Sequence, residues 1–234
     1  MKEYSSNEHN LWVEEVREIY NNAKSHTEPY EFDFFGTDLT IFPNVFSPKD
    51  FNNTKWYAEK LPGIIKGKSL LEIGTGTGAI AIHCHKNGIS TFATEINEDA
   101  YKCAEHNFEK HNCNIPVYIG DVYDALPDDF EKVDYIFWNH PYNNSKEKID
   151  DNLFIAGFDY NYDSLRKYIE KANNFMKNPD KGLLLGTGGH ADLKTIKDIA
   201  CGNQYKMTLV DSVIMPLGQY TIMPNDFRIY ELTK

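Results

Sequence analysis

Residues 70–81 read LLEIGTGTGAIA, and this stretch decides the fold. A short apolar run leads into glycines at positions 74, 76 and 78, and Ala-Ile-Ala follows them. The pattern predicts a strand, a tight turn and a helix, because glycine adopts positive φ and lets the backbone approach a ligand closely. The N–H groups at the start of the helix favour a polar ligand. We therefore expect a nucleoside-like ligand at this turn.

Acidic residues stand near the ends of three predicted strands. Glu72 precedes the first glycine by two positions, Glu95 follows the strand 91–94, and Asp121 follows the strand 117–119. Glu72 would face a positive amino group and repel a pyrophosphate. Glu95 lies about 20 positions after the glycines, where a carboxylate accepts hydrogen bonds from ribose hydroxyls. Asp121 is a candidate for the exocyclic amine of adenine, although a helix N-cap explains it nearly as well.

Strand-like and helical segments alternate from residue 69 onward. Strands are expected at Ser69–Ile73, Thr91–Thr94, Val117–Ile119, Val133–Trp138 and Leu183–Gly186, and helices at 78–87, 97–111 and 164–177. This alternation predicts an α/β fold with a parallel sheet. Two further strand-like runs, Tyr205–Met215 and Tyr220–Leu232, are joined through residues 216–218 and predict a closing antiparallel hairpin.

The first 62 residues have a different pattern. Residues 8–24 predict an amphipathic helix, residues 32–42 a hairpin around a Gly-Thr turn, and the next segment a helix that ends at Pro62-Gly63. The apolar stripe of the first helix consists of Leu11, Trp12, Val16, Ile19 and Tyr20. We expect one compact domain, in which residues 1–62 form a helix, hairpin and lid beside the substrate site. Residues 63–234 would then form the cofactor-binding core.

A further predicted strand ends in polar and aromatic residues. Residues 133–142 read VDYIFWNHPY, so that Asn139, His140, Pro141 and Tyr142 follow a buried strand. Ligands bind at the carboxyl edge of such sheets. This segment would therefore place an amide, two carbonyl groups and an aromatic ring at the ligand site.

The Asn-His-Pro-Tyr run resembles the Asn-Pro-Pro-Tyr motif of class I S-adenosylmethionine-dependent methyltransferases that modify planar nitrogens. These include adenine-N6 enzymes and the glutamine-N5 enzymes that act on translation release factors. The EIGTGTG turn resembles their first motif, and FFG at 34–36 and VFSP at 45–48 resemble the entry hairpin of the glutamine-modifying and small methyltransferase domain group. The resemblance covers roughly residues 30–190 and implies a Rossmann-like sheet, mostly parallel with an antiparallel C-terminal strand.

Two departures from the family pattern matter. His140 replaces the first proline of the motif, so the loop is less rigid and the imidazole could have a role of its own. The N-terminal helical domain of the bacterial release-factor enzymes is reduced here to one helix. The identity of the substrate therefore does not transfer from the resemblance.

The resemblance also implies a set of site residues. Expected contacts to S-adenosylmethionine are Glu72, Gly74, Thr75, Gly76, Thr77, Gly78, Glu95, Ile96, Asp121, Val122 and Asn139. Expected substrate contacts are Phe46, Pro48 and Tyr142, and the expected catalytic residues are Asn139, His140, Pro141 and Tyr142. The Asn139 side-chain oxygen and the His140 carbonyl could each accept a hydrogen from a planar –NH2, on which Tyr142 could stack. No strong base is needed, because the nitrogen becomes acidic as it is alkylated.

Composition narrows the classes of partner. The net charge of −11 makes extended nucleic-acid binding improbable, because such binding depends on clustered Lys and Arg. The chain begins without a signal-like apolar segment, no apolar run reaches the roughly 18 residues of a membrane span, and four scattered cysteines fit a reducing compartment. A cytoplasmic protein without membrane contact is expected.

We expect no metal site. His83 and His85 lie two positions apart on a helix, so their side chains point in different directions, and an ordinary helix surface explains Cys103, His106, His111 and Cys113.

Several alternatives remain open at this point. Gly74, Gly76 and Ala79, with Glu95 about 20 residues on, also satisfy the G-x-G-x-x-A pattern of a nicotinamide-dependent oxidoreductase. A non-catalytic binding protein is a further alternative, because fold does not imply function. For a methyltransferase, the acceptor could be the glutamine amide of a protein, an amine or amide of a small molecule, or a nucleobase. The net negative charge of the chain disfavours a nucleobase as acceptor, and the resemblance of the entry hairpin favours the glutamine side chain of a protein.

Overall fold

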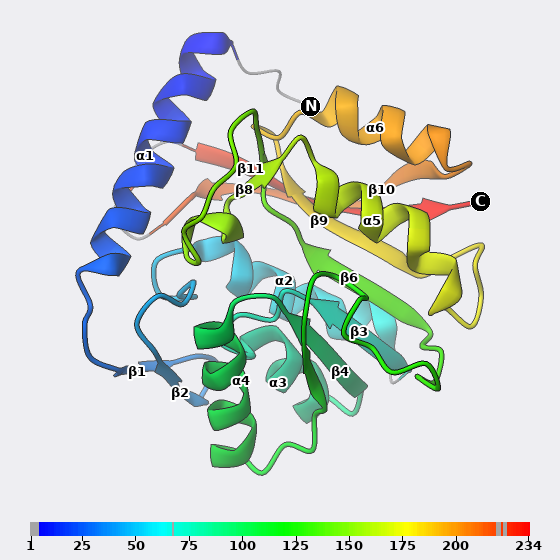
Figure 1. The fold of residues 1–234 in the computed structure, drawn as a ribbon, viewed down its shortest axis with the longest axis horizontal. Coiled ribbons are helices and arrows are strands. Elements are labelled where there is room, and N and C mark those ends of the chain that lie inside the picture. The colour runs from blue at the N-terminus through cyan, green and yellow to red at the C-terminus, as the bar shows by residue number, and fades with distance from the viewer. Residues whose placement is uncertain (1–4, 67, 219–220, 222–223) are drawn as a thin grey trace.

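The central feature of the computed structural model is a seven-stranded sheet (Figure 1). The structure describes residues 5–66, 68–218, 221 and 224–234. The order of the strands is β10-β11-β9-β6-β3-β4-β5. Their bounds are β3 Ser69–Ile73, β4 Ser90–Glu95, β5 Val117–Ile119, β6 Tyr135–Asn139, β9 Leu183–Gly188, β10 Lys206–Pro216 and β11 Pro224–Thr233. Strands β5, β4, β3, β6 and β9 are parallel, whereas β11 pairs antiparallel with β9 and with β10. The predicted fold class is confirmed.

Helices cover both faces of this sheet (Figure 1). The helices are α2 Asn52–Ile65, α3 Ala79–Lys86, α4 Glu98–Lys110, α5 Asp163–Lys171 and α6 Leu193–Gly202. Helix α2 packs against α3, and α5 packs against α6. The chain runs β3-α3-β4-α4-β5 toward one edge and then β6-α5-β9 toward the other. Because crossovers are right-handed, this reversal puts the two groups of helices on opposite faces and opens a ligand crevice between the ends of β3 and β6.

Helix α1 (Ser6–Lys24) lies outside these layers, along one side of the molecule (Figure 1). A capping box starts it: the Ser5 side chain accepts from the Glu8 N–H, and the Glu8 carboxylate accepts from the Ser5 N–H. Trp12, Val16, Ile19 and Tyr20 are buried, as their spacing predicts. Leu11 was expected on the same stripe, but its side chain is 53% exposed. The Leu11 side chain lies on the solvent-facing side of α1, away from the residues that the helix covers.

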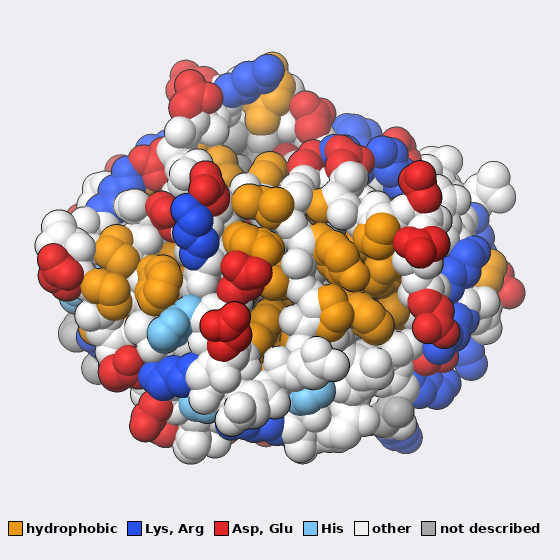
Figure 2. Space-filling view, turned by 60° about the horizontal axis from the view of Figure 1, so that its bottom comes forward, with side chains coloured by type: hydrophobic (Ala, Val, Ile, Leu, Met, Phe, Trp, Pro, Cys, Tyr) orange, Lys and Arg blue, Asp and Glu red, His pale blue; other side chains and the backbone are white. Residues whose placement is uncertain are grey.

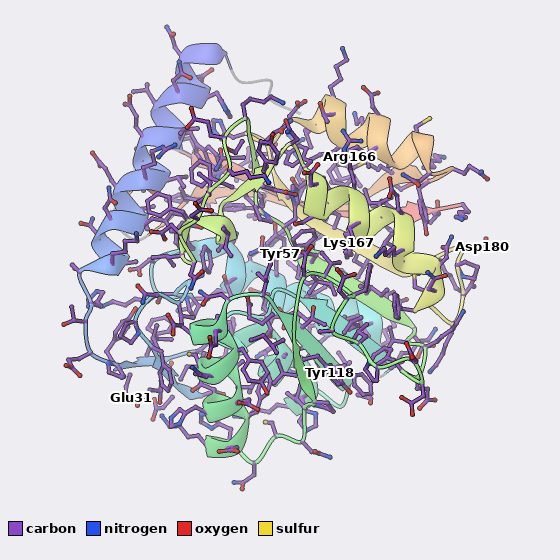
Figure 3. All side chains as sticks on the ribbon, viewed as in Figure 1. Glu31, Tyr57, Tyr118, Arg166, Lys167 and Asp180 are labelled. Carbon is purple, nitrogen blue, oxygen red and sulfur yellow. The ribbon has the colours of Figure 1, made fainter. Side chains whose placement is uncertain are left out.

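The predicted hairpin is formed by β1 (Tyr30–Asp33) and β2 (Asp38–Ile41). Its anchor is the buried Asn107 of α4. The Asn107 Oδ1 atom accepts from the Thr40 N–H at 2.8 Å, and its Nδ2 donates to the carbonyls of Thr40 and Thr77, each at 2.9 Å. Glu31, which Figure 3 labels, adds an ion pair with Lys110 of α4. Asn107 thus ties the hairpin directly to the glycine turn.

Some element boundaries were predicted wrongly. Helix α2 continues through Pro62 to Ile65 and ends where Lys66 adopts positive φ; burial of Leu61 and Ile65 holds this last turn in place. Helix α5 is shorter than expected and ends in a 3-10 turn at Ala172–Asn174. Helix α6 was missed, although Asp192 caps it through the Thr195 N–H. Sequence patterns also did not reveal a small parallel sheet, which consists of β7 (Asn143–Ser145) and β8 (Phe158–Tyr160). Positions 220, 222 and 223 of the second predicted C-terminal strand lie outside the described residues.

The surface in Figure 2 is consistent with an acidic protein. Hydrophobic and acidic side chains gather in the middle of this face, and Lys and Arg lie mainly toward its edges. Among the described residues, no helix is long and apolar enough to cross a membrane. The cytoplasmic location stays a prediction.

Candidate active site

The glycine turn joins β3 to α3 and is folded as its sequence predicts. Gly74, Gly76 and Gly78 all have positive φ, at 63°, 59° and 78°. A Cβ at Gly78 would lie 2.5 Å from Cε1 of Phe108, so glycine is needed there for packing against α4. A Cβ at Gly76 would meet nothing closer than 3.9 Å, so glycine there keeps space open beside the turn.

A cavity of about 110 Å³ opens above this turn, and we call it the glycine-turn cavity. It brings together most of the residues predicted to bind the cofactor. It is lined by Phe46, Pro48, Thr54, Glu72, Gly74, Thr75, Gly76, Thr77, Ile80, Glu95, Ile96, Asn97, Ala100, Trp138, Asn139, Pro141, Asn152, Ile155 and Ala156. Gly78 is absent from this lining and instead begins α3. Thr54, Asn97, Trp138 and Ile155 were not predicted.

Two buried carboxyl groups, those of Glu72 and Glu95, line the cavity beside the turn. The Thr75 hydroxyl donates to Glu72 at 2.7 Å. Burial raises the pKa of the Glu72 carboxyl to about 8; the Thr75 hydrogen bond opposes this rise and the Glu95 carboxylate adds to it. Glu95 accepts from the N–H groups of Gly76, Ile96 and Asn97 at 2.8, 2.9 and 3.0 Å. Burial raises the pKa of Glu95, and these backbone hydrogen bonds oppose the rise.

Asp121 and Val122 lie in a neighbouring cavity, here called the Asp121 cavity. It shares Gly74, Ile96, Trp138, Pro141 and Ile155 with the glycine-turn cavity, so the two cavities are adjacent. The Asp121 carboxylate forms an ion pair with Lys167 of α5, which Figure 3 labels, and Lys167 also pairs with Asp124. Asp121 is therefore close to the expected place, with its charge already compensated. Its role toward adenine stays a prediction.

Asn139 ends β6 beside the glycine turn, at the reversal of strand order. Its Oδ1 atom accepts from the Asn53 Nδ2 at 3.3 Å and from the Tyr142 hydroxyl at 3.2 Å. The Tyr142 hydroxyl also accepts from that of Tyr57 at 2.7 Å, and the Thr187 carbonyl lies 3.1 Å from the Tyr57 hydroxyl. Tyr57 is labelled near the centre of Figure 3 and belongs to α2. Sequence patterns did not reveal Asn53 or Tyr57, because apolar helix spacing explains the segment around them.

His140 is buried behind Asn139, with Nε2 3.0 Å from the Thr187 hydroxyl. Burial lowers the pKa of the imidazole to about 3. The ring is consequently neutral near pH 7. This environment favours a packing role over proton transfer.

A second cavity lies between these residues and α1, and we call it the α1 cavity. Its lining consists of Trp12, Val16, Tyr20, Phe46, Phe51, Asn53, Asn139, His140, Tyr142, Asn143, Ala156, Gly157 and Leu217. Asn139, Phe46 and Ala156 line both this cavity and the glycine-turn cavity. Trp12 covers it by stacking on His190, with ring centroids 5.0 Å apart, and on Tyr142 at 6.3 Å. Of the predicted substrate contacts, Phe46 and Tyr142 lie here, whereas Pro48 lines only the glycine-turn cavity.

The cysteines and histidines that could suggest a metal have protein partners instead. Cys103 Sγ donates to the Thr40 carbonyl, His106 contacts the Thr40 hydroxyl, and His111 contacts the Asp38 carbonyl. Within the part of the chain that the structure describes, no group of three His, Cys, Asp or Glu side chains is placed to hold a metal ion.

These features define a class I methyltransferase that depends on S-adenosylmethionine. They are a glycine turn, acidic residues at the strand ends, and the Asn-His-Pro-Tyr run where the strand order of a Rossmann-like sheet reverses. The chain belongs to the methyltransferase small domain family, whose model matches residues 37–167. This assignment sets aside the oxidoreductase and non-catalytic alternatives. S-adenosylmethionine is the cofactor, and the residues present fit it: open space at Gly76 and two buried carboxyl groups beside it.

Relatives and solved structures agree with this assignment. The chain is 33% identical over 148 residues to a putative protein N5-glutamine methyltransferase of Methanocaldococcus jannaschii, covering 61% of this chain and 72% of the relative. It is 30% identical over 128 residues to the release factor glutamine methyltransferase of Staphylococcus aureus, covering 54% of this chain and 46% of that enzyme. The chain thus spans about half the length of that release factor enzyme.

The structural likeness concerns the fold alone. A methyltransferase from Pyrococcus furiosus superimposes with a TM-score of 0.58 at 20% identity, over 93% of this chain and 98% of the other. The T. thermophilus 16S rRNA N2 G1207 methyltransferase, solved with AdoMet and guanosine, superimposes with a TM-score of 0.60 at 14% identity. The superposition covers 88% of this chain and 50% of the other.

Proposed function

We propose that this methyltransferase transfers the methyl group to a planar –NH2 nitrogen, either the glutamine side-chain amide of a protein or an amide or amine of a small molecule. The observation that carries the proposal is the position of Asn139, whose side chain lines both the glycine-turn cavity and the α1 cavity. A nitrogen held by the Asn139 Oδ1 atom and the His140 carbonyl would lie where the two cavities meet.

Each residue of the site then has a chemical role. Glu72 would hold the amino group of the cofactor, Glu95 its ribose hydroxyls and Asp121 the adenine amine, with Thr75 and Thr77 beside the turn. S-adenosylmethionine, when bound, would supply an electrophilic methyl group with its thioether as the leaving group, and the nitrogen would gain this methyl and lose one N–H proton to solvent. Asn139 orients the nitrogen lone pair, and Tyr142 supports Asn139 through its hydroxyl. Alignment can supply about 7–11 kcal/mol of the acceleration in favourable cases.

Two acceptors are in competition. The names of the relatives support protein glutamine. The covering of the α1 cavity by Trp12 and Tyr20, exposed by 2% and 1%, supports a small molecule, because a protein loop would have to displace α1. Residues 1–62 would in either case form one side of the acceptor site. A nucleobase acceptor is disfavoured by the net charge of −11.

Activity with a methyl-labelled donor tests the proposal. The panel is a release factor, small carboxamides and amines, and RNA, with the methylated atom located by mass spectrometry and NMR. Methylation on nitrogen of the release factor, or of a small carboxamide or amine, is the expected result, and methylation of the RNA alone would contradict the proposed acceptor class. A product methylated on carbon or oxygen would contradict the proposal, and the identity of the accepted member separates the two acceptors.

We predict that Glu95→Ala weakens cofactor binding by about 1–3 kcal/mol, which is the scale of a lost charge-assisted hydrogen bond. Calorimetry with S-adenosylhomocysteine measures this loss. Glu98→Ala is the matched control, since Glu98 lies at the start of α4 and pairs with Lys102 on the surface. Unchanged affinity in Glu95→Ala would remove the ribose assignment.

We also predict that cofactor binding at pH 7 releases a proton from Glu72. Its pKa of about 8 leaves the carboxyl largely protonated in the free protein, and an adjacent ammonium group would stabilise the charged form. Affinity should therefore rise with pH toward pH 8. Calorimetry in two buffers of different ionisation enthalpy counts the protons released. Glu72→Gln should abolish the release; an identical proton count in that variant would contradict the assignment.

A further inference from the structure

The oxygen that should receive the acceptor nitrogen already has two hydrogen-bond partners. Asn139 Oδ1 is contacted by Asn53 Nδ2 at 3.3 Å and by the Tyr142 hydroxyl at 3.2 Å. A carbonyl oxygen has two lone pairs. An incoming –NH2 group can therefore bind to Asn139 only if it displaces one of these two donors.

Tyr142 is the more firmly held of the two. Its hydroxyl lies 2.7 Å from that of Tyr57, which donates to it while Tyr142 donates to Asn139. Both tyrosine side chains are buried, and the Tyr142 ring stacks against Trp12. Displacement of Tyr142 would break this whole network, so Asn53 is the donor that can leave.

The orientation of the Asn53 amide is set by the chain itself. Its Oδ1 atom accepts from the Thr54 N–H at 2.9 Å, so the –NH2 edge must face Asn139 and the Tyr142 hydroxyl, which lies 3.1 Å away. Asn53 stands in the first turn of α2, is 4% exposed and lines the α1 cavity. A planar primary carboxamide thus donates a hydrogen bond to Asn139 at the point where the two cavities meet.

The size of the α1 cavity limits what else could occupy this position. Its volume is about 30 Å³ with Asn53 in place. For comparison, an engineered apolar cavity that binds benzene has a volume of about 150 Å³. A carboxamide that takes the place of the Asn53 amide requires little more room, whereas an aromatic amine or a nucleobase requires α1 to move away.

On the basis of the proposed N-methylation, we propose that the Asn53 carboxamide is a resident stand-in for the acceptor, and that the acceptor group is a primary carboxamide. Asn53 satisfies Asn139 and the Tyr142 hydroxyl while the acceptor is absent, since buried polar groups left without partners are costly. The acceptor amide then replaces it on the same oxygen. Asn53 competes with the acceptor and so lowers its apparent affinity.

The test compares two neighbouring asparagines in the same helical turn. In Asn53→Ala the competitor is removed. Asn52→Ala is the matched control, because the Asn52 side chain donates to the Pro216 carbonyl and lies outside the cavity lining. The probes are propionamide and an N-acetylated tripeptide with a central glutamine; aniline and adenine represent the other nitrogen classes. Affinity is measured by NMR titration with S-adenosylhomocysteine present, and KM and kcat with labelled donor.

We expect Asn53→Ala to bind a carboxamide probe about 2- to 10-fold more tightly than the parent protein, the scale of one net hydrogen bond. KM should fall similarly while kcat changes less than twofold, and Asn52→Ala should match the parent. If the alanine variant does not fold, Asn53→Ser replaces it, because its hydroxyl can still accept from the Thr54 N–H. Equal or weaker binding in the folded variant, or a raised KM with a lowered kcat, would overturn the stand-in role.

The four probes also distinguish failure of the Asn53 proposal from failure of the proposed N-methylation on which it rests. Methylation of aniline or adenine but neither carboxamide would overturn the carboxamide class and leave N-methylation standing. Methylation on carbon or oxygen would overturn the proposed function, whereas the NMR titration would still report on Asn53. Tighter binding of propionamide supports a small-molecule carboxamide, and tighter binding of the tripeptide alone supports a glutamine side chain of a polypeptide.

Discussion

Replacement of Asn139 by alanine is expected to lower turnover at least about 100-fold and to leave cofactor affinity nearly intact, because its oxygen acts in aligning the nitrogen. Asn139 is one of many residues that line the glycine-turn cavity, and it also lines the α1 cavity, so most contacts to the cofactor would survive. Turnover, calorimetric affinity and melting temperature on the same variant are the measurements.

The control for this prediction is Asn144→Ala. Asn144 follows the same motif but its side chain donates to Asp192 on the surface, away from Asn139. This variant should keep the parent rate. If Asn139 merely held a turn, Asn139→Ala would melt earlier without a selective loss of turnover, and a parent-like rate in Asn139→Ala would exclude its proposed role.

Gly76→Val is expected to weaken cofactor binding at least about 100-fold while the chain still folds. The branched side chain would fill the glycine-turn cavity, yet its Cβ would lie no closer than 3.9 Å to a neighbouring atom, so the cost to folding is mainly that of positive φ. Calorimetry and a thermal melt measure the two effects separately.

Two other glycines supply the controls. Gly88 also has positive φ, with open space around it and no part in the cavity lining, so Gly88→Val should show the backbone strain without the loss of binding. Gly78→Val should instead unfold the protein, because its Cβ would overlap the ring of Phe108. A folded Gly76→Val variant with full cofactor affinity would place the ligand elsewhere.

Local sequence determined the architecture and the part of the site around the glycine turn. The glycine spacing at 74–78 predicts its own turn, and apolar runs predict β3 and β5 with their observed bounds. The carboxyl ends of parallel strands meet at one edge of a sheet, so the predicted strand ends also bring Glu72, Glu95 and Asn139 together. These inferences succeed because each depends on neighbours in the chain and on one general property of parallel sheets.

Only the tertiary structure decided which partners these side chains have. Asn53 and Asn139 are 86 positions apart, and Tyr57 and Tyr142 are 85 apart, so no local pattern predicts their hydrogen bonds. The pairing of Asp121 with Lys167 likewise depends on where α5 packs.

The protonation states of Glu72 and His140 also depend on the folded structure. An exposed glutamate and an exposed histidine would titrate near their ordinary pKa values, whereas burial raises the pKa of Glu72 to about 8 and lowers that of His140 to about 3. Removal from water disfavours the charged form of both groups, and the extent of that removal is a property of packing. The type of residue at each position was thus readable from the chain, and its charge and its hydrogen-bond partners were decided by what the folded protein places around it.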